Sequence, residues 1–147
     1  GYGRNLGNYI AGNSVRYLLE NNLNIERNLI LRPFLQTMSS SQKHIHRERL
    51  IGECNVSIFM YGQSPKNGKY INSKGMIKEY NLAKDLGNII IPLGVTGYTA
   101  KDIWNDVKSN IIMYPYLERY IDALNSETDP DNLVKVIIQI LSDVERR

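Results

Sequence analysis

The segment that most constrains the fold is the apolar run over residues 88–94, Asn-Ile-Ile-Ile-Pro-Leu-Gly. An uninterrupted run of this length is typical of a β-strand buried on both faces, as in parallel sheets covered by helices. Two further apolar runs, at 56–61 and 29–34, predict strands that end at Gly62 and near Pro33. We therefore predict an α/β fold: a Rossmann-like three-layer sandwich with a mostly parallel sheet flanked by helices.

Amphipathic helices separate and follow these runs. Apolar residues recur at helical spacing, and polar residues mark the starts of helices. Ser73 is expected to cap one helix and Thr99 the next, in which Trp104 and Val107 are the apolar anchors. Apart from the helix that Thr99 is expected to cap, the expected helices cover residues 7–21, 43–53, 74–86, 114–125 and 130–146.

Composition narrows the class of protein. With 147 residues, 42% hydrophobic and 22% charged, the chain is expected to form one globular domain over residues 1–147. The net charge of +3 is spread along the chain and predicts no nucleic-acid binding, and no apolar run reaches the roughly 18 residues of a membrane span. Cys54, the one cysteine, is interpreted as a buried apolar residue of a cytoplasmic protein. His44 and His46 lack a second ligand pair nearby, so we expect no metal site.

In parallel sheets, ligands bind beyond the carboxyl ends of the strands, where loops carry the chemistry. We expect four segments there: the start of the chain, the segment after Phe34, the polar segment 63–69 with its Asn-Gly turn signal, and the loop that holds Gly94 and Thr96. This rule locates a candidate site without naming its ligand.

Three features near this edge each have a functional and an ordinary interpretation. The glycine-rich residues 1–8 precede a helix and can bring backbone amides to a phosphate, or can form only a tight turn; both remain open. Glu79 can accept paired ribose hydroxyls, although a lone helical glutamate is more often solvated. Arg32 offers a donor fork that suits phosphate, whereas most surface arginines contact only solvent.

Taken in order, several segments carry a family resemblance that covers nearly the whole chain. The chain resembles the SLOG-type (STALD) sensor domains of Thoeris anti-phage effectors. The segments that carry the resemblance are the glycine-rich opening, Leu-Ile-Leu-Arg-Pro-Phe (29–34), His-Arg-Glu-Arg-Leu-Ile (46–51), Ser-Ile-Phe-Met-Tyr-Gly (57–62), Ser-Lys-Gly-Met-Ile-Lys-Glu-Tyr (73–80) and the run from Ile91 to Trp104.

The resemblance implies a ligand-sensing domain rather than an enzyme. Such a domain binds a cyclic ADP-ribose isomer made by a partner TIR enzyme, needs no cofactor besides this signal, and activates a sirtuin-like NAD-cleaving domain linked upstream. It also implies a homo-oligomer, a dimer or a tetramer. The strand-helix-strand unit that normally precedes the glycine-rich loop is not in this sequence, so we expect it to lie upstream of Gly1.

The resemblance also implies site residues. The essential arginine of the family falls on Arg47, its ribose-binding glutamate on Glu79, and its ligand lysine on Lys66, with Lys69 as the alternative. The remaining implied residues supply phosphate-facing backbone amides: Gly3, Arg4, Leu6 and Gly7.

Two other functions stay open. The related LOG enzymes, which hydrolyse nucleoside monophosphates at the ribose, carry Pro-Gly-Gly-x-Gly-Thr-x-x-Glu before the helix that supplies their glutamate. Residues 70–79 keep Gly75 and Glu79 but lack the double glycine, and a hydrolase needs that loop to hold the phosphate while charge develops at the ribose. This departure favours sensing. The third function is a structural oligomerisation domain, in which the apolar stripe of the last helix forms an interface.

Overall fold

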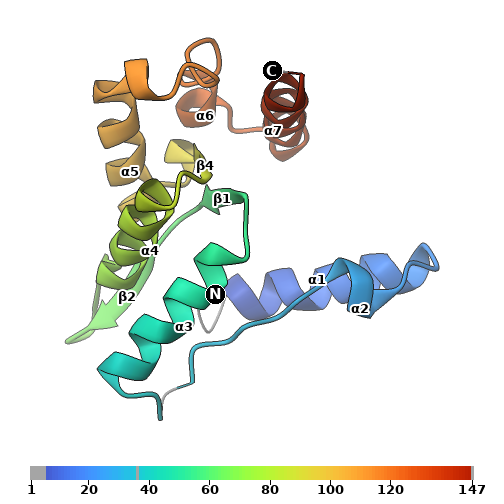
Figure 1. Cartoon of the computed structure of the whole chain (residues 1–147), viewed down its shortest axis with the longest axis vertical. Helices are drawn as coiled ribbons and strands as arrows, with labels where there is room; N and C mark the ends of the chain where they lie inside the picture. Colours follow the sequence, from blue (N-terminus) through green and yellow to red (C-terminus); the bar gives the residue numbers. More distant parts are fainter. Residues whose placement is uncertain (1–5, 36, 147) are drawn as a thin grey trace. The chain divides into compact units, whose positions relative to one another are not determined.

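The computed structural model describes residues 6–35 and 37–146, except for the side chain of Leu6. The chain forms two compact units, Gly1–Glu53 and Cys54–Arg147, each of which is considered by itself (Figure 1).

The described part of the first unit is helical. It contains α1 (Leu6–Glu20), α2 (Ile25–Asn28) and α3 (Ser40–Gly52). Helix α3 begins three residues before the predicted start at residue 43, because Ser39 and Gln42 form a capping box in which each side chain accepts a hydrogen bond from the backbone of the other. The predicted helix 7–21 is confirmed to within one residue at each end.

Residues 29–34, predicted as a strand, form no strand, and that prediction is wrong. A strand needs a neighbouring strand to satisfy its backbone, and none is present among the described residues of this unit. Proline at position 33 also removes one backbone donor. Phe34 instead packs edge-on against the ring of His46 in α3, with 4.8 Å between the ring centroids.

The second unit is built on a parallel sheet. Strands β1 (Val56–Phe59) and β4 (Ile89–Pro92) pair in parallel register from Val56 opposite Ile89 to Phe59 opposite Pro92. Ile90 and Ile91 are almost fully buried, as the run at 88–94 predicts. The outer edge of β4 is closed by a side chain, because the Tyr116 hydroxyl accepts the Ile90 N–H at 2.9 Å and donates to the Ile90 carbonyl at 3.3 Å.

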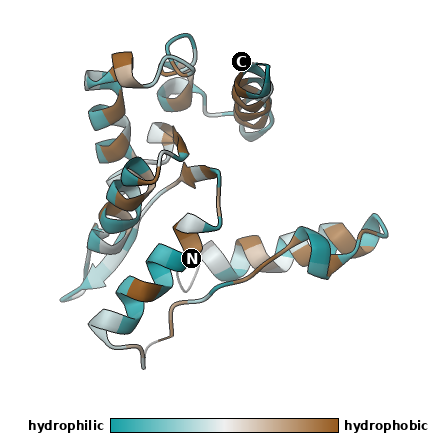
Figure 2. Ribbon diagram, in the orientation of Figure 1, coloured by the Kyte–Doolittle hydropathy of each residue, from teal (hydrophilic) through white to brown (hydrophobic). Residues whose placement is uncertain are grey.

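Helices pack against this sheet, and the predicted Rossmann-like α/β layout is confirmed. Helices α4 (Lys74–Asp85) and α5 (Tyr98–Ser109) contact the strands, and Trp104 and Val107 of α5 are buried as predicted. The other helical elements are η1 (Gly94–Thr96), η2 (Ile111–Met113), α6 (Ala123–Ser126) and α7 (Pro130–Glu145). Figure 2 shows that hydrophobic residues make up much of α7. Among them, Ile140 is fully buried.

Between the sheet and α4 the chain forms a hairpin. Strands β2 (Gln63–Lys66) and β3 (Lys69–Asn72) are antiparallel and are joined by Asn67 and Gly68, both at positive φ (50° and 73°). Two consecutive residues at positive φ match the type I′ turn that Asn-Gly favours. The predicted turn is confirmed, whereas the segment 63–69, which contains β2, was expected to be a loop.

Two other expectations are wrong. The predicted helix 114–125 is mostly a series of turns. Hydrogen bonds between residues three positions apart close these turns, such as the one from the Leu117 N–H to the Tyr114 carbonyl at 2.8 Å. Buried residues recur there at about every third position, and the indole N–H of Trp104 donates a hydrogen bond to the Ile121 carbonyl at 2.7 Å, so a regular helix does not form.

Cys54 is exposed rather than buried because it precedes β1 and lies outside the sheet core.

None of the helices in the described ranges is both long and apolar enough to cross a membrane.

Candidate site at the carboxyl ends of the parallel strands

In the second unit the carboxyl ends of β1 and β4 are joined by a threonine. The Thr96 hydroxyl, in η1, accepts the Tyr61 N–H at 2.7 Å and donates to the Leu93 carbonyl at 2.7 Å. Thr96 therefore holds the segment after β1 against the segment after β4. Its hydroxyl proton is already engaged, so a ligand would meet only its remaining acceptor capacity.

A second threonine is fully buried beside it. Thr99 was expected to cap α5, but the N-cap position is Gly97, and no side chain caps the helix. The Thr99 hydroxyl instead donates to the Gly62 carbonyl at 2.5 Å and accepts the Ser73 N–H at 2.7 Å. This correction has a physical reason: the Thr99 hydroxyl bridges the Gly62 carbonyl and the Ser73 N–H, which also bond to each other at 2.9 Å, and so holds the segment after β1 against the start of α4.

Two glycines at this edge leave no room for a side chain. A Cβ on Gly62, whose φ is +87°, would lie 2.5 Å from the Met76 sulfur and 2.7 Å from the Thr99 Cβ. A Cβ on Gly94 would lie 2.7 Å from the Trp104 ring. The predicted site residue Gly94 is therefore buried at a close-packing position.

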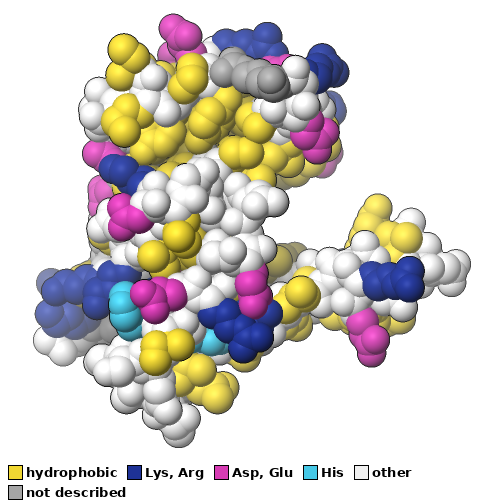
Figure 3. Space-filling view, viewed as in Figure 1, with side chains coloured by type: hydrophobic (Ala, Val, Ile, Leu, Met, Phe, Trp, Pro, Cys, Tyr) yellow, Lys and Arg dark blue, Asp and Glu magenta, His cyan; other side chains and the backbone are white. Residues whose placement is uncertain are grey.

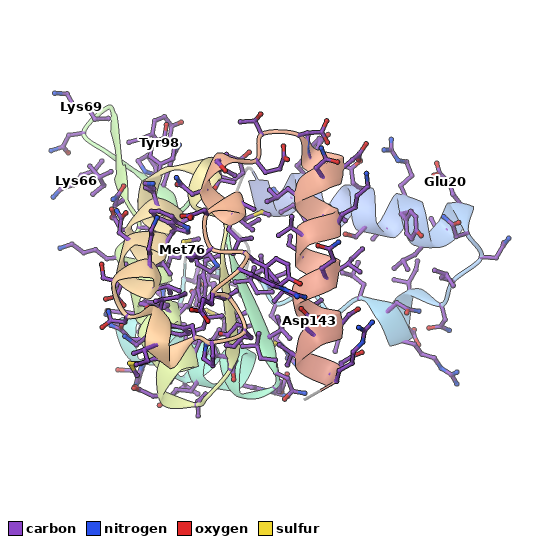
Figure 4. The ribbon with its side chains drawn as sticks, turned by 90° about the horizontal axis from the view of Figure 1, so that it is seen from above. Glu20, Lys66, Lys69, Met76, Tyr98 and Asp143 are labelled. Atoms are coloured by element: carbon purple, nitrogen blue, oxygen red, sulfur yellow. The ribbon has the colours of Figure 1, made fainter. Side chains whose placement is uncertain are left out.

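The hairpin carries the two candidate lysines. Lys66 and Lys69 stand opposite each other in register, and both are exposed. Figure 4 shows their side chains extending from the end of the hairpin. Neither ammonium group has an ion-pair partner within the part of the chain that the structure describes, so each is available to an anionic ligand.

Glu79 lies in the middle of α4 and is half-buried. Its neighbour Tyr80 is buried and donates to the Asp106 carboxylate at 2.5 Å, which fixes α4 against α5. Burial, followed by the hydrogen bond to Asp106, raises the pKa of Tyr80, so the hydroxyl stays protonated. The same hydrogen bond, helped by Lys84, lowers the pKa of Asp106. The backbone that carries Glu79 is thus rigidly held.

In the first unit Arg47 is held by an aromatic ring. Its guanidinium carbon lies 4.7 Å from the centroid of the Phe34 ring, and its Nη1 donates to the Lys43 carbonyl at 3.3 Å. The side chain is half-buried. Phe34 lies at the end of the predicted strand 29–34, and no spacing in the sequence indicates that its ring supports Arg47.

Arg32 is engaged by a carboxylate. It forms an ion pair with Glu53, which also accepts from the Arg49 Nε at 3.0 Å. The hydrogen bond from Arg49 is the largest of the effects that lower the pKa of Glu53. In Figure 3 basic and acidic side chains lie next to one another over this unit. A phosphate at Arg32 would have to compete with Glu53 for the guanidinium.

The predicted residues at the start of the chain are only partly described. Gly3 and Arg4 lie outside the described residues, as does the side chain of Leu6, which opens α1. Gly7, in the first turn of α1, is buried.

The structure groups the predicted site residues by unit. Lys66, Glu79, Gly94 and Thr96 belong to the second unit, and Arg32 and Arg47 to the first. The second unit also has a surface hollow of about 430 Å³. Tyr116, Arg119 and Asp143 contribute to its lining, and none of the predicted site residues does. Within residues 6–35 and 37–146 no group of three His, Cys, Asp or Glu side chains could hold a metal ion.

A parallel sheet flanked by helices, with connecting loops gathered at the carboxyl ends of its strands, defines the class of Rossmann-like α/β domains. Within that class the chain belongs to the STALD family, described as the Sir2- and TIR-associating SLOG family, whose model matches residues 1–144.

The chain is also similar to part of several bacterial proteins named NAD(+) hydrolase ThsA. It is 30% identical to that of Bacillus cereus (strain MSX-D12) over 149 residues, which cover 96% of this chain and 31% of the relative. It is 28% identical to that of Enterococcus faecium over 153 residues, which cover 99% and 31%. The protein of Acinetobacter baumannii (strain 532279) is 26% identical over 96% of the chain. The chain thus spans about a third of the length of these curated relatives.

Proposed function

We propose that this chain is a regulatory domain that binds a cyclic ADP-ribose isomer and thereby activates a linked sirtuin-like, NAD-cleaving effector in cytoplasmic anti-phage defence. The observation that carries the proposal is the STALD match over residues 1–144, a family described by its association with Sir2 and TIR domains. The relatives are named NAD(+) hydrolases, and about two thirds of their length lies outside the match, which is room for an effector.

The chemistry of the candidate residues supports a ligand with a diphosphate and two riboses. Lys66 and Lys69 present ammonium groups, and Arg47 a guanidinium fork, all of which suit phosphate oxygens. Glu79, on a helix held by Tyr80, is suited to ribose hydroxyls, as acidic residues are in dinucleotide sites.

The structure of residues 70–79 supports sensing over hydrolysis. Where a LOG enzyme has a glycine-rich phosphate loop, this chain has strand β3, the cap Ser73 and the first turn of α4, which contains Gly75. Ser73 uses its hydroxyl to accept the Met76 N–H at 3.3 Å. A helical first turn closed by its own cap lacks the flexible double glycine on which phosphate binding in those enzymes depends.

Calorimetry of the full chain against cyclic ADP-ribose isomers, AMP and NAD tests the proposal. We expect saturable binding of one isomer at one site per chain and no release of ribose 5-phosphate from AMP. Binding of none of the isomers, together with turnover of AMP, would overturn the proposal in favour of a phosphoribohydrolase. We also propose that the protein is a dimer or a tetramer, which light scattering with and without the isomer checks.

A further inference from the structure

Two tyrosines have a backbone conformation that is costly for a bulky residue. Four non-glycine residues in the described ranges have positive φ: Asn22, Tyr61, Asn67 and Tyr98. The two asparagines lie in turns, after α1 and within the hairpin, where asparagine often adopts this conformation. Tyr61 (φ 56°) and Tyr98 (φ 53°) have no such explanation, because tyrosine gains nothing locally from the left-handed region.

Both strained tyrosines lie at the carboxyl end of the parallel sheet. Tyr61 follows β1 by two residues, and Tyr98 opens α5 immediately after η1, which follows β4. The backbone of Tyr61 is hydrogen-bonded at both ends to the segment that contains Tyr98: its N–H to the Thr96 hydroxyl at 2.7 Å, and its carbonyl to the Ala100 N–H at 3.0 Å. These bonds hold the strained conformation and keep the two positions in one local structure.

Neither ring belongs to the buried core. Tyr61 is 42% exposed and Tyr98 47%, whereas Tyr80 and Tyr114 of the same unit are buried. A glycine with positive φ stands beside each strained residue, Gly62 after Tyr61 and Gly97 before Tyr98. Glycine at the tyrosine positions would make the same turns without strain. Strain that the fold does not need, at the edge where ligands bind, indicates a role in binding.

We propose that Tyr61 and Tyr98 form the base-recognition surface of this domain and that their rings stack on the purine base of the ligand. Exposed tyrosine rings present flat π-faces with few rotatable bonds, which suits a planar heterocycle. The proposal rests on the proposed function and adds to it the part of the site that takes the base.

The positions of the lysines agree with a site in which different residues bind the phosphates and the base of the ligand. Asn72, the last residue of β3, donates a hydrogen bond to Asp102 of α5. This bond connects the end of the lysine-bearing hairpin nearest α4 to α5, the helix that begins at Tyr98. Figure 4 shows Tyr98 projecting outward on the side from which the hairpin with Lys66 and Lys69 extends. Phosphates would be bound by the lysines and the base by the tyrosines.

Glycine substitutions separate this binding role from a structural one. Tyr61→Gly and Tyr98→Gly remove a partly covered ring and at the same time relieve the positive-φ strain, two opposing effects, so we expect the melting temperature to change little. We expect each to weaken binding of the cyclic ADP-ribose isomer by roughly 5- to 150-fold, the range that corresponds to one base–aromatic stack. Tyr61→Phe and Tyr98→Phe keep the ring and should retain affinity within a factor of about three.

Asn22→Gly is the matched control, since it relieves positive φ in a turn of the other unit and should leave affinity unchanged. If the parent chain binds the isomer and both tyrosine-to-glycine variants bind it equally well, the base-recognition role is wrong while the proposed function stands. A large fall in melting temperature in both glycine variants would also overturn it, because the rings would then serve the fold. If the parent chain binds no isomer, the proposed function itself fails.

Discussion

At the scale of single residues, Arg47, which we propose as a ligand-binding residue, is held in place by its neighbours. The Phe34 ring below it and the Lys43 carbonyl fix the guanidinium before any ligand arrives. A pre-positioned donor loses less side-chain entropy on binding than a free one, so its contribution to affinity is larger.

Removing either Arg47 or Glu79 should therefore weaken binding strongly. We expect Arg47→Ala and Glu79→Ala each to cost about 2–4 kcal/mol of binding free energy, because each leaves a polar group of the bound ligand without its partner. Calorimetry with the cyclic ADP-ribose isomer measures this loss.

The controls are Arg49→Ala and Glu48→Ala, which remove exposed charges of α3, the helix that carries Arg47, whereas Glu79 lies on α4. They should bind like the parent. Equal affinity of the parent, Arg47→Ala and Glu79→Ala would show that these two residues were assigned wrongly, even in a chain that binds the ligand.

Gly62 provides a residue-scale test of the geometry at the carboxyl end of β1. Gly62→Ala places a Cβ against Met76 and Thr99 and holds alanine at positive φ, so we expect a loss of about 2–4 kcal/mol in the free energy of unfolding. Gly68→Ala, at φ +73° with open space around it, should cost only about 1 kcal/mol. Urea unfolding of the two variants gives the difference, and equal losses would contradict the close packing at Gly62.

At the scale of elements, the long apolar run at 88–94 was predictable because burial on both faces leaves a direct imprint on sequence. The helix 74–86 was predictable in the same way, from Ser73 and its apolar spacing, and the structure confirms it. The run at 29–34 has similar composition but no described strand beside it, and pairing is not visible in local sequence.

The candidate site was predictable only in part for a related physical reason. Sequence patterns placed Gly94 and Thr96 at a strand end, and the structure does so too. The strain at Tyr61 and Tyr98, the support of Arg47 by Phe34 and the burial of Thr99 depend on tertiary contacts, which no spacing in the sequence encodes.

The edge of β4 is an element-scale feature that one hydroxyl maintains. Tyr116→Phe leaves the N–H of Ile90, a residue 1% exposed, without its partner, so we expect a loss of about 1–3 kcal/mol in the free energy of unfolding. Chemical denaturation measures it, with Tyr70→Phe on the exposed hairpin as the control. A Tyr116→Phe variant as stable as the parent would mean that water or another group reaches this edge.

At the scale of the whole molecule, the chain corresponds to about a third of proteins named as NAD(+) hydrolases, and its family is described by association with Sir2 and TIR domains. The regulation that we propose requires that the ligand bind better to the active state of the protein than to its inactive state. A ligand that does not bind cannot shift this equilibrium, so a variant that loses ligand binding should also lose activation.

The most direct test measures NAD cleavage by the full-length protein that carries this chain, with and without the cyclic ADP-ribose isomer that binds it. At an isomer concentration just sufficient to activate the parent, we predict that the isomer increases NAD cleavage in the parent and leaves the Arg47→Ala variant near its basal rate. NAD cleavage that is the same with and without the bound isomer would contradict the account.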